Sequence, residues 1–288
     1  MSPKFIFIPL LILAMVTMAC GITINLPITQ VKTGPTQTDQ VAIPLPANSS
    51  DHSDIRLDFG AGELRLAPGA ENALVSGTFS YNVPDFKPVV TVSGTNVHIE
   101  QGNLNIKGFP NFQQTIKNTW DLKFGNQPIK LQINAGAYNG NFELGGLFLE
   151  DLQVSDGASD VQLAFSKPNL TEMASFGYST GASTVTLKEL ANANFKTMSF
   201  KSGAGSYKLD FSGALQRDAS VTIDSGVSSV SVSVPQGISA RLSFEGGLSN
   251  VNISGAWQKS GNSYTQQGSG PTLTITVKMG AGSLDLSN

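Results

Sequence analysis

Pairs of short runs of alternating apolar and polar residues recur along the chain from Ile55 onward, and one glycine separates the two runs of each pair. Between Gly136 and Gly247 the successive spacings of these glycines are 21, 24, 22, 23 and 21 residues. A fixed period of this length is typical of stacked structural repeats. The eight anchor glycines are Gly60, Gly136, Gly157, Gly181, Gly203, Gly226, Gly247 and Gly280.

The apolar residues keep fixed distances from each anchor glycine. Apolar residues occupy the positions five and three residues before the glycine and four and six residues after it. The one exception in the eight repeats is Gly140. Because offsets that differ by two lie on one face of a β-strand, each repeat is predicted to be two strands joined at a glycine bend. The glycine suits either a positive φ or a close approach of stacked backbones. One repeat cannot bury its apolar face alone, so neighbouring repeats are expected to stack.

The pattern predicts an all-β, solenoid-like stack of 21–24-residue glycine-cornered repeats, of the β-helix type, as a single domain over residues 51–288. Two insertions interrupt it, at about residues 67–128 and 256–271. The second is predicted to be a hairpin or loop that turns at Gly261 and Asn262. Strand candidates in the first insertion are Ala73–Val83, Pro88–Gln101 and Thr119–Phe124.

The N-terminus has the features of an export signal. Lys4 precedes an apolar run from Phe5 to Met18, which is shorter than the roughly 20 residues that a membrane-spanning helix needs. Residues 1–19 are therefore predicted to be a lipoprotein signal peptide. The next residue, Cys20, is the only cysteine of the chain and directly follows a small residue.

A cysteine in this position is expected to carry lipid, although an incidental thiol within a signal peptide is the alternative reading. Lipid on Cys20 would hold the protein on the extracytoplasmic face of the cell membrane. Residues 20–50 are predicted to be the lipidated cysteine and a disordered tether, because prolines are frequent there and charges are almost absent.

Several segments resemble the toast-rack family of bacterial surface proteins, whose wider relatives include adhesin domains and domains of cell-wall-antibiotic-response membrane proteins. The resemblance covers about residues 54–288. It implies a β-repeat domain at the cell surface and no defined active site. The segments that carry it are DFGAGEL (58–64), NTWDL (118–122), KSGAG (201–205) and FSG (211–213).

Neither the net charge nor the outward-facing residues indicate a catalytic, metal or nucleic-acid-binding site. With 18 basic and 21 acidic residues, the net charge is -3, and no basic stripe suggests a nucleic-acid partner. If successive repeats stack in register, Asp224 and Glu245 become neighbours. They could then act as a paired carboxylate site or as two ligands of a cation. The preferred interpretation is that they are an exposed pair without a ligand, with Lys201 on the neighbouring repeat easing their repulsion. A catalytic or metal site on His98 would need partners that the sequence does not identify, so no catalytic residue, metal or cofactor is predicted.

Three aromatic residues that do not occupy the apolar positions of the repeats are weak candidates for contact with a ligand: Trp120, Trp257 and Tyr264. Packing within the insertions, or capping of a solenoid end, is the alternative. The leading hypothesis is a non-enzymatic cell-surface lipoprotein, structural or adhesin-like. Its expected partners are the membrane, through Cys20, and a cell-wall polysaccharide or surface protein. A β-helical polysaccharide-active enzyme is the rival, and the resemblance alone adds an accessory in envelope-stress sensing.

Overall fold

The computed structural model describes residues 28–48, 52–103, 109–111 and 115–288. The predicted signal peptide and Cys20 lie outside the described residues. Two compact units divide the chain. In the first, strand β1 (Ile28–Gln30) pairs in parallel with β7 (Phe109–Asn111). The second unit, residues 33–103 and 116–288, holds a 15-stranded sheet and is described below.

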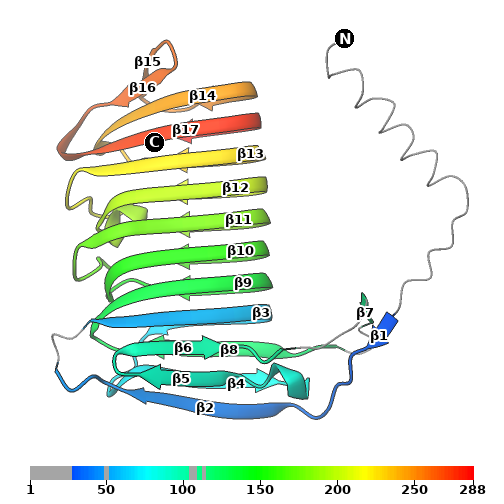
Figure 1. The fold of residues 1–288 in the computed structure, drawn as a ribbon. Helices are drawn as coiled ribbons and strands as arrows, with labels where there is room; N and C mark the ends of the chain where they lie inside the picture. Colours follow the sequence, from blue (N-terminus) through cyan, green and yellow to red (C-terminus); the bar gives the residue numbers. More distant parts are fainter. Residues whose placement is uncertain (1–27, 49–51, 104–108, 112–114) are drawn as a thin grey trace, which may run out of the picture. The chain divides into compact units, whose positions relative to one another are not determined.

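Eight long parallel strands form the body of this sheet, one for each anchor glycine (Figure 1). The predicted two-strand repeats are therefore confirmed in outline, but each is one continuous strand that bends at its glycine. No described helix is long and apolar enough to cross a bilayer. The eight strands are β3 (Ser53–Pro68), β9 (Pro128–Glu143), β10 (Phe148–Ala164), β11 (Met173–Lys188), β12 (Phe195–Asp210), β13 (Ala219–Ser233), β14 (Gly237–Ile253) and β17 (Gly268–Ser287).

Close stacking, and not a positive φ, explains the anchor glycines. A Cβ on Gly136 would lie 2.3 Å from the carbonyl oxygen of Gly60, the anchor of the neighbouring strand. On Gly181 it would lie 2.5 Å from the carbonyl oxygen of Gly157. Because backbone lies against backbone at the bend, there is no room for a side chain.

The apolar positions at fixed offsets from the anchor glycines, here called the apolar grid, form the core. Its positions are buried on all eight strands except at Val251, which is half-buried, and Ile253, which is 38% exposed. The one non-apolar grid position, Gly140, is covered by two neighbouring rings on its own strand. A Cβ on Gly140 would lie 2.9 Å from Tyr138 Cε2 and 3.1 Å from Phe142 Cζ.

The first insertion closes one end of the stack. Strand β6 (Asn96–Glu100) pairs in parallel with the first half of β3, and β8 (Asn118–Phe124) pairs in parallel with its second half. The two strands together replace one long strand. Antiparallel partners extend both halves: β5 (Val89–Ser93) pairs with β6, and β4 (Ala73–Tyr81) pairs with β8.

The predicted tether requires a correction. Its residues Gln37–Pro44 form strand β2, which pairs antiparallel with β4, so the sheet begins before the expected domain start at residue 51 (Figure 1). Within β2, Val41 is half-buried and Ile43 is 3% exposed, which shows that this strand contributes to the core. The prolines at its margin do not prevent pairing, because an edge strand tolerates missing donors.

The order of the last strands also differs from the sequential order. Strand β17 lies between β13 and β14, so that the final strand of the chain is interior. The second insertion makes this possible, since it forms the predicted hairpin of β15 (Gln258–Ser260) and β16 (Ser263–Gln266) beside β14. Along β14, strand β16 covers residues 240–243. The second half of β14 therefore lacks this cover, which accounts for the exposure of Ile253.

Candidate functional site

A cluster of charged side chains lies on the outward face where β3 meets β6. The two strands pair in register, Arg56 with His98 and Asp58 with Glu100. Because alternate residues of these strands are buried in the core, all four side chains point away from it. The insertion strand β6 thus brings a histidine and a glutamate to the first repeat.

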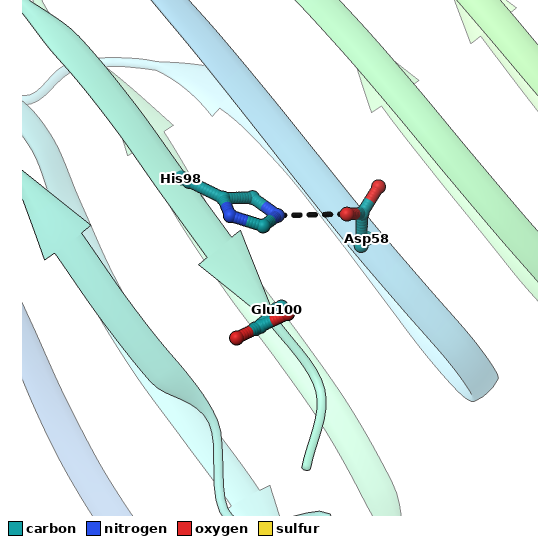
Figure 2. A group of neighbouring side chains, drawn as sticks. All are labelled: Asp58, His98 and Glu100. Carbon is teal, nitrogen blue, oxygen red and sulfur yellow. Dashed lines mark hydrogen bonds and ion pairs between the residues drawn. The ribbon is translucent and has the colours of Figure 1, made fainter. Parts of the chain in front are cut away.

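Asp58 is the centre of this cluster. Its Oδ2 lies 2.7 Å from His98 Nε2 (Figure 2), and since a carboxylate only accepts, the imidazole donates from Nε2. Arg56 Nε lies 3.0 Å from both carboxylate oxygens. Asn134, on the neighbouring strand β9, donates from Nδ2 to Oδ1 over 2.7 Å. Three donors therefore fix the orientation of one half-buried carboxylate.

The same donors set the acidity of Asp58. Burial by itself raises the pKa of this carboxyl, but the hydrogen bonds from Arg56, Asn134 and His98 stabilise the charged form. The balance leaves the pKa of Asp58 below its ordinary value of 3.8. The carboxylate is consequently ionised at neutral pH and available as an acceptor or a ligand.

Asp58, His98 and Glu100 each offer one potential ligand atom, and these atoms lie within 4.8 Å of one another. Asp58 and His98 are half-buried, and Glu100 is exposed. The sequence alone does not identify these partners of His98. Glu100 is the alternate residue of the same strand, so strand periodicity could have placed it beside His98. Asp58 lies on β3, and only the register of β6 against β3 could have shown that it is a partner.

Two adjoining hollows continue from this cluster along the outer face of the sheet. The first, of about 560 Å³, is lined by Arg56, Thr91, His98 and Lys130 among others. The second, of about 590 Å³, extends to Lys201 on β12. Both are lined by Gln132 and Gln153, which therefore lie where the two hollows meet.

The amide of Gln153 is held in place by its neighbours. It donates from Nε2 to Asp151 Oδ1 and to Ser175 Oγ, each over 2.9 Å. A Cβ on Gly177 would lie 2.0 Å from Gln153 Oε1, so the glycine at this outward position leaves room for the amide. Both N–H groups of this amide are thus engaged within the protein, and its orientation is defined.

The predicted neighbours Asp224 and Glu245 are not adjacent, which corrects the proposed carboxylate pair. Strand β17 separates them, and Lys278 is in register with both. Lys278 Nζ lies 3.6 Å from Glu245 Oε2. The lysine between the two carboxylates opposes cation binding at this position. The expected neighbour Lys201 is in register with Asp224.

The three aromatic candidates are buried. Trp120 is 0% exposed and packs edge-on against Phe59 and Phe79, at ring-centroid distances of 5.0 and 5.1 Å. Trp257 and Tyr264 are 9% and 2% exposed, in and beside the β15–β16 hairpin. Their positions correspond to the core and capping alternative, and they offer little ring surface to a ligand.

Comparison with known proteins identifies one family. The family model described as "N-terminal domain of toast_rack, DUF2154" matches residues 32–177. No curated protein matches the chain. A solved structure of a candidate cell adhesion protein from Clostridium sporogenes has 19% identity and a TM-score of 0.46, covering 88% of this chain and 99% of that one.

Two further solved structures come from Parabacteroides. A candidate lipid binding protein from P. distasonis has 14% identity and a TM-score of 0.39, covering 90% of this chain and 99% of that one. A candidate adhesin from P. merdae has 12% identity and a TM-score of 0.37, covering 90% and 98%.

Proposed function

This chain belongs to the toast-rack family, and from that premise we propose that it is a non-enzymatic, lipid-anchored surface module that binds a neutral polar polymer such as a cell-wall polysaccharide. The anchor in this proposal is lipid on Cys20, at the end of the apolar N-terminal run, which would place the sheet on the extracytoplasmic side of the membrane.

The observation that carries the proposal is the pair of adjoining hollows on the outer face. Amide and hydroxyl groups predominate in the second hollow, where Gln132, Asn134, Ser155, Ser179 and Ser199 contribute side chains from four successive strands. Amides and hydroxyls both donate and accept hydrogen bonds, as sugar hydroxyls do. A polymer lying across the strands would meet such groups at each step of about 4.8 Å.

The test is binding of the full chain to isolated cell walls and to a panel of soluble polysaccharides. The double variant Gln132→Ala/Gln153→Ala removes both shared amides and is expected to weaken binding about tenfold or more, as loss of about 1.4 kcal/mol or more would. Gln162→Ala is the matched control, because Gln162 is exposed on the second half of β10, away from both hollows. Equal binding by the double variant and the control would refute the proposal.

One observation favours the rival enzyme. His98 and Asp58 form a hydrogen-bonded pair beside a hollow that Thr91 and Ser93 also line, so an acid–base group stands near hydroxyls. Turnover of any polysaccharide in the panel, abolished by His98→Gln, would replace the binding module by an enzyme. The binding proposal expects no turnover.

A further inference from the structure

We propose that Asp58, His98 and Glu100 form a binding site for a divalent transition cation of the zinc type. An imidazole together with two carboxylates is a donor set that Zn²⁺ takes in proteins. Ca²⁺ fits less well, since it takes six to eight oxygen ligands and this cluster contains two carboxylates. This proposal is independent of polysaccharide binding.

The backbone fixes the relative positions of the three ligands. His98 and Glu100 are alternate residues of β6, and Asp58 is in register with Glu100 on β3. Strand β3 is held by β9 on its other side, and β6 is held by β5. Side chains on paired strands are positioned more accurately than side chains on loops. The ligand atoms, which lie within 4.8 Å of one another, therefore need only side-chain adjustment to accept one ion.

The surroundings of Asp58 are those of a metal-ligating carboxylate. Asn134 Nδ2 holds Oδ1 at 2.7 Å, which turns Oδ2 toward His98. Partners of this kind orient ligands at metal sites and raise affinity. To bind the ion, His98 must present a nitrogen lone pair, which the imidazole supplies from a ring nitrogen that carries no hydrogen.

Arg56 is the cationic group that opposes binding, because Nε lies 3.0 Å from both Asp58 oxygens. Its side chain is 53% exposed, so the guanidinium can turn into solvent when an ion arrives. Removing its charge should strengthen metal binding by about threefold, the value of an exposed charge interaction. A specific site predicts this increase, whereas a structural ion-pair cluster predicts none.

The histidine content of the chain gives a direct test. His52 and His98 are its only histidines, and among the described residues His52 has one carboxylate partner, Glu150, whose Oε2 lies 2.6 Å from Nδ1. The full chain, labelled with ¹⁵N-histidine, is titrated with zinc chloride and followed by NMR. The imidazole signals of His98 are expected to shift saturably at one ion per chain, while those of His52 stay in place.

Calorimetry on variants supplies the second readout. His98→Gln keeps a donor for Asp58 and is expected to abolish zinc binding, whereas its matched control His52→Gln retains it. Glu100→Gln should weaken binding about tenfold, and Arg56→Gln should strengthen it. Cys20, a potential zinc ligand itself, is common to all variants. Parallel shifts of both histidines, absence of shifts at millimolar zinc, or undiminished binding by His98→Gln would overturn the proposal.

Discussion

The hydroxyl of Tyr178, on β11, donates a 2.8 Å hydrogen bond to the carboxylate of Asp156 on β10. Tyr138 on β9 donates to the same oxygen over 3.2 Å, and Thr180 donates to the other oxygen. Asp156 directly precedes the anchor Gly157, so this network joins three strands at the bend. Burial, and then the nearby charges, raises the pKa of both tyrosines, so both hydroxyls remain donors.

Replacing Tyr178 by Phe is therefore expected to lower the free energy of unfolding by about 1.5–3 kcal/mol, the range for a hydrogen bond to a charged group. Urea unfolding of the full chain measures it. Tyr264→Phe is the matched control, because Tyr264 is buried but its hydroxyl has no hydrogen-bond partner among the described residues. Equal losses in the two variants would mean that the bond to Asp156 contributes nothing.

The anchor glycines should not tolerate even one methyl group. In Gly181→Ala the new Cβ would lie 2.5 Å from a backbone oxygen of the neighbouring strand, which cannot move without separating two paired strands. The expected loss of unfolding free energy is about 2–3 kcal/mol, as for overpacking in a core. In the control Gly34→Ala the nearest atom is 3.9 Å away, and a change within about 0.5 kcal/mol is expected. A neutral Gly181→Ala would contradict the close stacking.

The lowered pKa of Asp58 predicts a pH dependence of stability. A carboxyl with a lower pKa in the folded than in the unfolded state stabilises the fold above its ordinary pKa of 3.8, and this contribution is lost as the pH falls through the folded pKa. Asp58→Asn should therefore be less stable than the wild type at about pH 5, with the difference shrinking as the pH falls below the ordinary pKa of 3.8. Denaturant titrations of both proteins at each pH measure it. A difference that stays constant would exclude this linkage.

Periodicity predicted the parts of the fold that depend on local sequence. The apolar grid identified the core, and the turn at Gly261 identified the β15–β16 hairpin, because both follow from spacing within a short segment. The resemblance named the family correctly. Lipidation of Cys20 stays a prediction, since that residue lies outside the described chain.

Relations between distant segments could not be predicted from the same pattern. Strand β2 has only one alternation of apolar residues, Val41 and Ile43, and prolines nearby favoured a tether. The cluster around His98 depends on the register between an insertion strand and the first repeat. The strand order could not be predicted, because every repeat has the same apolar offsets. The apolar pattern of β13 therefore matches that of β14 and that of β17 equally.

That strand order can be tested by disulfide formation. Asp224 and Lys278 are in register on neighbouring strands, about 4.8 Å apart. This distance lies within the range of about 4.4–6.8 Å between the Cα atoms of a disulfide. In a Cys20→Ala background, which removes the only native cysteine, the pair Asp224→Cys/Lys278→Cys should oxidise to an intramolecular disulfide that mass spectrometry detects after alkylation.

The pair Asp224→Cys/Glu245→Cys distinguishes the two possible orders. With β17 between them, these positions lie about two strand spacings apart, near 10 Å, and no bridge can form without backbone movement. Glu245→Cys/Lys278→Cys is the positive control, because that pair is adjacent whether β14 follows β13 directly or lies beyond β17. A disulfide between positions 224 and 245, without one between 224 and 278, would show that the repeats stack in their order along the chain.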